Sequence, residues 1–579
     1  MGHPVRQIDA DLLIIGGGGA GAKAAIEAHE RGVKVVMLVK GFLGRSGCSI
    51  FAGNLNWFGP PQDGTTAVQS DEERQRRTME FLAKYTHYLG DQEYMRRAAR
   101  FTFDHFYPWL EERGLYILRH DDGSIVIDLP HGTQAWATKM GMSGQVIMDM
   151  LRAEIFRRGI TVLEETAATS LLTAGGEVVG ATALDYRHGE QLVVRAKATI
   201  LATGHSNYLS LRSTGTREGT GAGWVMALRA GCALQNLEMQ WFHASDMAWP
   251  RSWMRLHLYP NPQPATAHRT RLYNRDGECF FDGNFLPHNP VPYIMQLKYL
   301  VKQVRRGKAR FDGGYYTGYR HVEPDVLRKY VYQTQFLEKV GLDPTRDLIE
   351  NAVTWHMNVG GIRVDGRTMA SGIPRLYVAG SVSALVTGGL PNVMYDGHVA
   401  ALHAADAVRG RALPALDEAV VARDLDRVQR LFRTEPRDGY LPAQVIKQIR
   451  TVMWEHMNYV KHEVTMREGL EKLHRIRVEV LPRMRLESLT RRFNYDWMEA
   501  VDAEDMLDAC ELVIRFSLYR RESRGAFFRE DYPLTDNIRW LRHVVGRLDG
   551  GDLKIETEPV DLPYARPAEG VADFFEVDY

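Results

Sequence analysis

The sequence predicts an α/β fold with three parts: a Rossmann-like dinucleotide-binding domain, an inserted, mixed and loop-rich second domain, and a C-terminal helical domain. Three observations predict it. A strand, a glycine-rich turn, a helix and a second strand follow one another near the N-terminus. Two further strands that end in glycine occur much later, near residues 200 and 378. The last third of the chain carries long segments of helical periodicity.

The N-terminal unit is a βαβ motif. Residues 11–15 are an apolar run typical of a buried parallel strand, residues 22–31 predict a helix, and residues 33–39 predict the second strand. The turn between them matches G-x-G-x-x-G, in which the glycines allow a tight turn, close approach of a pyrophosphate and close helix packing. The helix N-terminus then stabilises the phosphate charge. The pattern predicts a dinucleotide-binding loop made of Gly16, Gly18, Gly19, Ala20 and Gly21.

The dinucleotide-binding domain is predicted to be discontinuous. Residues 198–202 form an apolar strand that runs into Thr203 and Gly204, and residues 375–379 form another that runs into Gly380 and Ser381. Between these strands, prolines and dense aromatic residues break any long element. We therefore expect residues 1–235 and 346–410 to form the dinucleotide-binding domain and residues 236–345 to form the inserted domain.

The C-terminal part has a different character. Residues 444–470 and 501–519 are almost free of proline and glycine, and their charged and apolar residues alternate at helical spacing. These segments predict a helical domain over residues 411–549. The acidic tail, residues 550–579, contains three prolines and is expected to lie on the surface.

The composition excludes several classes of protein. Of 579 residues, Lys plus Arg and Asp plus Glu number 72 each, so no net positive charge favours nucleic acid. The four cysteines are far apart, which argues against a disulfide framework, a zinc ribbon or an iron–sulfur cluster within this chain. No apolar run is long enough for a membrane span, and the polar N-terminus lacks a secretory signal. A cytoplasmic protein is expected, and any attachment to a membrane would come through a partner.

The glycine motif alone does not distinguish NAD from FAD, because the second strand ends in Lys40 rather than in the usual ribose-binding acid. Four other stretches are more specific: residues 41–53 with Arg45-Ser46, residues 219–243 ending in Glu-Met-Gln-Trp-Phe-His, residues 356–362 (His-Met-Asn-Val-Gly-Gly-Ile), and residues 521–533 with Arg-Glu-Ser-Arg-Gly. In this order, over nearly the whole chain, they resemble the flavoprotein subunits of succinate dehydrogenases and fumarate reductases. L-aspartate oxidase and adenylylsulfate reductase are relatives of that family.

The resemblance implies FAD, and non-covalent FAD, because Gly47 stands where covalently flavinylated members have histidine. Ala222 and Ser381 stand where the family has acids near the FAD, and Phe527 stands where it has a histidine, so we expect altered hydrogen bonding around the cofactor. Together, motif and resemblance assign these residues to cofactor binding: Gly16, Gly18, Gly19, Ala20, Gly21, Lys40, Arg45, Ser46, Gly53, Thr203, Gly204, Gly380, Ser381, Asn392 and Val393.

The resemblance also implies that the inserted domain is an α+β capping domain. It places a small-molecule substrate between this capping domain and the flavin, with hydride moving between flavin N5 and a substrate carbon. His243 and His356 match two family histidines that donate hydrogen bonds to a substrate carboxylate. Two arginines of the family are missing: residues 286–290 and 387–393 contain none. A substrate other than a simple C4 dicarboxylate is therefore expected. The proton donor stays unassigned, with Tyr395, His288 and a cap arginine as candidates.

Two alternatives remain open at this point. One is sulfur chemistry of the adenylylsulfate reductase type on the same fold, and the other is a non-catalytic flavoprotein subunit of a complex. With no cluster cysteines of its own, the chain would exchange electrons through a quinone, a soluble donor, or an iron–sulfur or other electron-transfer subunit.

Overall fold

The computed structural model describes residues 5–52, 55–56, 71–117, 121, 132–133, 143–250, 258, 270–282, 292–328, 331–385, 389–432 and 438–577. Its centre is a seven-stranded sheet in the order β5-β2-β1-β8-β7-β6, with β16 also paired to β8. Strands β5, β2, β1, β8 and β16 are parallel, whereas β7 pairs antiparallel with both β8 and β6. The strands are β1 (Val5–Ile15), β2 (Val35–Val39), β5 (Thr161–Glu164), β6 (Thr166–Ala174), β7 (Glu177–Asp185), β8 (Glu190–Leu201) and β16 (Leu376–Val378).

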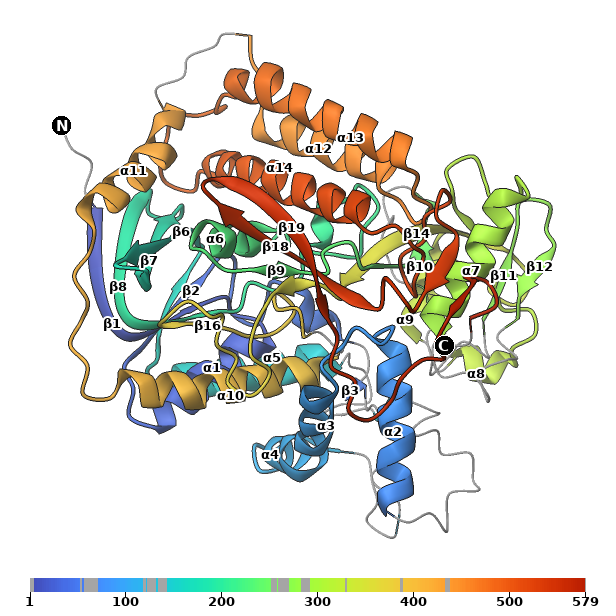
Figure 1. Cartoon of the computed structure of the whole chain (residues 1–579), viewed down its shortest axis with the longest axis horizontal. Helices are drawn as coiled ribbons and strands as arrows, with labels where there is room; N and C mark the ends of the chain where they lie inside the picture. Colours follow the sequence, from blue (N-terminus) through green and yellow to red (C-terminus); the bar gives the residue numbers. More distant parts are fainter. Residues whose placement is uncertain are drawn as a thin grey trace.

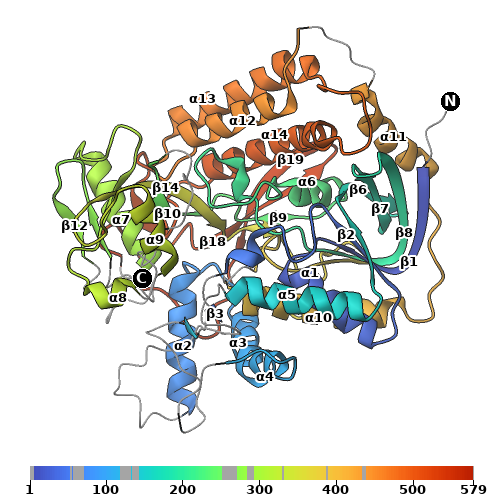
Figure 2. The same cartoon turned by 180° about the vertical axis from the view of Figure 1, so that it is seen from behind.

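Both faces of this sheet are buried, which explains the continuous apolar run of its first strand. Leu12 and Ile14 pack into one hydrophobic core, and Leu13 and Ile15 pack into another. Three helices cover the face that carries Leu12 and Ile14, as Figures 1 and 2 show: α1 (Gly19–Glu30), α5 (Ser143–Arg157) and α10 (Leu390–Val408). Helices of the C-terminal part lie on the opposite side in both views. The predicted N-terminal βαβ unit and the second and third strand–glycine segments are thus confirmed.

The capping domain contains a five-stranded antiparallel sheet in the order β10-β14-β13-β11-β12. In Figure 1 it lies to one side of the central sheet, with helices α7, α8 and α9 beside it. Strand β14 follows the predicted boundary at residue 345 and still pairs with β10 and β13. Its elements are β10 (Gln240–Met247), β11 (Arg271–Tyr273), β12 (Cys279–Phe281), α7 (Pro292–Arg305), β13 (Tyr315–Gly318), α8 (Pro324–Arg328), α9 (Val331–Lys339) and β14 (Ile349–Asn358).

The C-terminal part is helical, as predicted, but the segment 444–470 is two helices, α12 (Pro442–His456) and α13 (Glu463–Arg475). The break has a tertiary cause: Lys461 N donates to Phe528 O at 3.2 Å, and Glu530 N donates to Lys461 O at 2.8 Å. The side chain of His462 then caps the N-terminus of α13 by accepting from Val464 N. Other helices here are α11 (Glu418–Gln429) and α14 (Tyr495–Tyr519).

The C-terminal tail adds strands to this part. β19 (Asp552–Pro559) pairs along its whole length with β18 (Arg542–Asp549), and β18 pairs with β9 (Leu234–Gln235), which also pairs with β15 (Gly361–Ile362). A short ribbon joins β17 (Leu534–Asp536) to β20 (Val571–Asp573). The remaining described helices and strands are β3 (Leu55–Asn56), α2 (Asp71–Tyr85), α3 (Gln92–Phe101), α4 (Tyr107–Glu111), β4 (Gly132–Thr133) and α6 (Ala222–Arg229).

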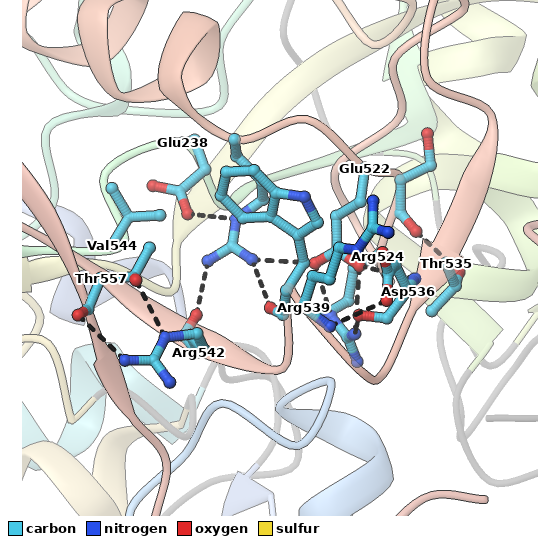
Figure 3. Close-up of polar contacts among 12 residues, drawn as sticks. Glu238, Glu522, Arg524, Thr535, Asp536, Arg539, Arg542, Val544 and Thr557 are labelled. Atoms are coloured by element: carbon cyan, nitrogen blue, oxygen red, sulfur yellow. Dashed lines mark hydrogen bonds and ion pairs between the residues drawn. The ribbon is translucent and has the colours of Figure 1, made fainter. Parts of the chain in front are cut away.

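A buried ionic cluster joins the segment that enters the capping domain to the C-terminal part (Figure 3). The Arg520 guanidinium donates to Glu238 at 2.7 Å and to Glu522 at 2.8 Å, and Glu522 also accepts from Arg524 at 2.9 Å. All four side chains are 0% exposed. Arg520 also donates to the backbone oxygens of Trp540 and Arg542, at 3.0 and 2.9 Å. Since each charge has an opposite partner, the cluster fixes the two segments against each other.

Among the described residues, no helix has both the length and the apolar character that crossing a membrane requires.

Candidate functional site

The glycine-rich loop joins β1 to the N-terminus of α1, and its glycines are needed where other backbone comes close. Gly16 has φ +117°, and a Cβ atom there would lie 2.2 Å from Ala202 O on the neighbouring strand. A Cβ atom at Gly21 would lie 2.0 Å from Gly16 O. The Ser49 side chain accepts a hydrogen bond from Gly19 N at 3.0 Å, which ties the loop to the segment after β2. The helix N-terminus is thereby free of bulky side chains and suited to a phosphate.

The loop forms part of the wall of a cavity of about 880 Å³. Eight of the residues predicted to bind cofactor line it: Gly16, Gly18, Lys40, Ser46, Thr203, Gly204, Ser381 and Val393. They come from the carboxyl ends of β1, β2, β8 and β16 and from α10, the edge at which parallel sheets bind ligands. The structure therefore brings together residues that the sequence separates by hundreds of positions.

The other predicted cofactor residues lie around the cavity rather than in its described lining. Gly19, Ala20 and Gly21 form the first turn of α1, and Asn392 is buried in the first turn of α10. The guanidinium of Arg45 forms an exposed ion pair with Asp149. Gly380 N donates to the carboxylate of Asp396 at 3.0 Å. Gly53 lies outside the described residues.

Unsatisfied polar atoms show what kind of molecule the cavity fits. Within the described part of the chain, Thr203 Oγ1, His205 Nδ1 and Asn207 Oδ1 are buried without a hydrogen-bond partner, and all three residues line the cavity. Buried polar atoms are normally paired, so these atoms favour a polar occupant. Burial lowers the pKa of His205 to about 4, so its ring is neutral at physiological pH. A glycine loop, a helix N-terminus and unsatisfied polar groups along one long cavity fit FAD.

Sequence reasoning missed two parts of this wall. Residues 166–169 of β6 and residues Asp502 and Asp505 of α14 line the cavity. Lys40 Nζ donates to both carboxylate oxygens of Asp502, at 2.6 and 2.7 Å. Burial raises the pKa of Asp502, and the charge of Lys40 opposes this. Only the fold brings these residues to the end of β2, so no local sequence signal could have identified them.

The two predicted substrate histidines lie on the paired strands β10 and β14. His356 lines the cavity, and its Nδ1 is 2.9 Å from Thr214 Oγ1. The His356 carbonyl accepts from the Asn207 side chain, which further fixes the strand. His243 pairs with Thr354 in the β10–β14 register, but its side chain lies outside the description. The antiparallel pairing thus places the two histidine-bearing segments side by side, and His356 of β14 lies on the cavity wall.

Of the two other catalytic candidates, only Tyr395 lies among the described residues, and the structure does not bring it to His356. Tyr395 faces away into the contact between α10 and α3, where its ring centroid lies 5.7 Å from that of Tyr94 and 5.2 Å from that of Phe101. It is buried and is not among the described residues that line the cavity. Burial raises the pKa of its hydroxyl, with Arg97 opposing. His288 lies outside the described residues, as do Arg251, Arg255 and Arg269 of the capping domain.

His87, a buried histidine that no sequence motif pointed to, accepts a hydrogen bond from a side chain of β10. Trp241 Nε1 donates to His87 Nε2 at 3.1 Å, and Ala526 N donates to the same nitrogen at 3.3 Å. A Cβ atom at Gly525 would lie 2.1 Å from the His87 ring. Burial, together with the charges of Arg524 and Arg520, lowers the pKa of His87 to about 3. A neutral imidazole that accepts at Nε2 therefore joins three segments of the chain.

Acid is expected to destabilise the protein partly through His87. Its pKa is about 3 when folded and 6.5 when unfolded, so the unfolded chain binds this proton first. The stabilisation is complete above pH 6.5 and is lost as the pH falls, at about 1.4 kcal/mol per pH unit. The unfolding free energy is measured near pH 7 and again about one pH unit below 6.5. Its decrease between the two pH values should be about 1.4 kcal/mol smaller in His87→Gln than in the wild type. An identical loss in both proteins would contradict this role of His87.

Two protein-family models match this sequence. The family described as an FAD binding domain matches residues 11–392, and the family described as the fumarate reductase flavoprotein C-terminal region matches residues 446–571. A chain of the CoM/CoB fumarate reductase of Methanothermobacter marburgensis is 28% identical over 550 residues, which cover 93% of the present sequence and 97% of that protein.

Solved structures extend the similarity over the whole chain. Mycobacterium smegmatis Sdh1 in complex with UQ1 has a TM-score of 0.80 and 26% identity, covering 97% of this chain and 96% of that one. Adenylylsulfate reductase from Archaeoglobus fulgidus also has a TM-score of 0.80, with 20% identity and 98% of both chains covered. At that lower identity the likeness concerns the fold alone.

Proposed function

Because the chain belongs to the flavoprotein family of fumarate reductases and succinate dehydrogenases, and is thus an FAD-dependent oxidoreductase, we propose a specific reaction for it. The reaction is hydride transfer between the cofactor and a carbon of an activated C–C bond, in a substrate other than a simple C4 dicarboxylate. FAD supplies the redox chemistry by accepting or donating a hydride at flavin N5 when it is bound. The chain's own side chains supply position and charge.

The observation that carries this proposal is the placement of His356. Its ring lines the same cavity as the glycine loop, and Thr214 Oγ1 lies 2.9 Å from Nδ1. Because the Thr214 hydroxyl can hydrogen-bond Nδ1, it fixes the ring orientation, and in this proposal Nε2 is the nitrogen that contacts the substrate. An imidazole held in this way orients an electron-withdrawing group of the substrate by hydrogen bonding.

The two missing arginines favour a substrate with fewer carboxylates, because residues 286–290 and 387–393 contain none. Among the described lining residues, Lys40 and Arg217 are the only lysine or arginine. Lys40 is paired with Asp502, and the Arg217 guanidinium lies 5.4 Å from the Tyr495 ring, in a smaller adjoining cavity. A carboxylate clamp of the bidentate arginine kind has no counterpart among these described residues. We therefore propose a larger or less charged acceptor.

The substrate class is tested by reducing the bound flavin anaerobically and adding acceptors while absorbance near the flavin maximum is recorded. Larger monocarboxylate or carbonyl-conjugated alkenes are expected to reoxidise the flavin faster than fumarate does. Rapid reoxidation by fumarate would contradict the proposed substrate class. A flavin adduct with sulfite, or reoxidation dependent on AMP and sulfite, would favour sulfur chemistry instead. A flavin that cycles with no donor or acceptor would favour a non-catalytic subunit.

His356→Ala is expected to retain FAD while turnover falls by about 10²-fold or more, because one positioned donor is lost from the reacting end of the cavity. FAD content by absorbance and steady-state turnover check this together. His403→Ala, an exposed histidine on α10, is the matched control and should leave both unchanged. Unaltered turnover in His356→Ala would remove His356 from the proposed mechanism.

We further propose that electrons reach this chain through a separate partner. Its four cysteines, Cys48, Cys232, Cys279 and Cys510, are all unpaired and widely spaced. An iron–sulfur or other electron-transfer subunit, which would also provide any attachment to a membrane, fits this arrangement. Copurification of a metal-containing protein with the chain expressed in its native host tests the proposal.

A further inference from the structure

We propose that Asp502, on helix α14 of the C-terminal part, provides the acid that binds the adenosine ribose of the cofactor. In dinucleotide-binding βαβ units this acid usually ends the second strand and accepts from a ribose hydroxyl. Here β2 ends at Val39 and is followed by Lys40, whose side chain has no hydrogen-bond acceptor. The acid therefore comes from a segment 462 positions further along the chain.

The geometry places the Asp502 carboxylate where the missing acid belongs. Lys40 Nζ lies 2.6 and 2.7 Å from its two oxygens, so the lysine holds the carboxylate beside the end of β2. Thr220 Oγ1 lies 3.4 Å from Oδ1. Both Lys40 and Asp502 line the cavity. A carboxylate has about four acceptor sites, so one lysine and one hydroxyl leave room for a ribose hydroxyl.

The other acids in the described lining are less suited. Asp505 lies one helical turn beyond Asp502, and its carboxylate is engaged by Arg229 at 2.9 Å. Glu218 Oε1 lies 3.5 Å from the position of a Cβ atom at Gly41, so it is near the same strand end. However, Glu218 is only half-buried, whereas Asp502 is buried and fixed by Lys40. Glu218 is therefore the competitor that an experiment must separate from Asp502.

The inference has a thermodynamic consequence for the fold. If α14 supplies a cofactor contact, FAD has a higher affinity for the state in which the C-terminal part is docked than for the state in which it is undocked. FAD and the docking of α14 then stabilise each other by the same factor.

The test compares FAD with its analogues deoxygenated at the 2′ or the 3′ position of the adenosine ribose. Apoprotein is titrated with each flavin, and the dissociation constant is obtained from flavin fluorescence. Wild-type protein should bind at least one deoxy analogue about 10-fold or more weakly than FAD, as expected for a lost hydrogen bond to a charged group. Asp502→Asn should weaken FAD by about the same factor and should bind FAD and that analogue equally.

Two controls separate this role from a structural one. Asp508→Asn, on the same helix and paired at the surface with Arg229 and Arg477, should keep the full discrimination between FAD and the deoxy analogue. Glu218→Asn should also keep it. An Asp502→Asn protein that weakens FAD and both analogues equally, while still discriminating among them, would overturn the proposal, as would loss of discrimination in Glu218→Asn alone. If Asp502→Asn does not fold, the wild-type comparison decides, because equal affinity for FAD and both analogues rules out a ribose contact.

Discussion

Gly16→Ala is expected to yield protein that retains almost no FAD. The residue has φ +117°, which alanine rarely adopts, and the new Cβ would lie 2.2 Å from Ala202 O. Relief of that contact must move β1 away from β8, because Ala202 N donates to Ile15 O at 2.8 Å across the same pair of strands. Strain and overpacking together amount to about 3 kcal/mol or more. The ratio of flavin to protein after purification, measured by absorbance, tests the first effect, and thermal unfolding tests the second.

Gly32→Ala separates backbone strain from the loss of the site. Gly32 follows α1 with φ +77°, and a Cβ atom there meets nothing within 4 Å. This variant should lose only about 1–2 kcal/mol of stability and keep its full content of FAD. If both variants lost flavin equally, general destabilisation rather than the loop geometry would explain the result.

Arg520→Met should destabilise the protein by about 3–5 kcal/mol, because removal of one partner leaves buried charge uncompensated. Glu238 loses its only described cation, at 2.7 Å, and Glu522 keeps Arg524 alone. Burial already raises the pKa of Glu238, and Arg520 is the group that opposes this. The backbone oxygens of Trp540 and Arg542 also lose a donor (Figure 3). Denaturant unfolding of the FAD-bound protein provides the measurement.

Arg547→Met is the matched control for this prediction. Arg547 pairs with Glu556 and Glu558 on the surface strands β18 and β19, and its side chain is 40% exposed. An exposed pair contributes about 0–1 kcal/mol, so this variant should unfold nearly as the wild type does. Equal losses of unfolding free energy in the two variants would show that the buried cluster contributes no more to the stability of the fold than an exposed ion pair does.

The sequence predicted the parts of the site that depend on local pattern. The glycine loop follows a strand and begins a helix, so its geometry is encoded within about 30 residues. His356 was identified from a resemblance, and it lies on the cavity wall. The break between α12 and α13 was not predicted, because it depends on hydrogen bonds to residues 528 and 530.

Residues whose role depends on packing could not be predicted. Tyr395 lies on α10, and only the contact of this helix with α3 decides that its ring faces Tyr94 and Phe101. Lys40 was noted as a departure from the usual acid, yet nothing local to β2 indicates that Asp502 lies beside it. Nothing in the sequence singles out His205, because its unpartnered nitrogen is evident only once the cavity is formed.

The cavity is assembled from nearly the whole chain, and this has a consequence for how the protein is made. Its first wall residue is Ile15 and its last is Asp505. A ribosome adding about 5–20 residues per second needs roughly half a minute to one and a half minutes to travel between them. During that interval the nascent protein has the phosphate-binding loop but not the helix that closes the site. Stable loading of the cofactor therefore follows synthesis of α14, and translation products truncated before this helix should emerge as apoprotein.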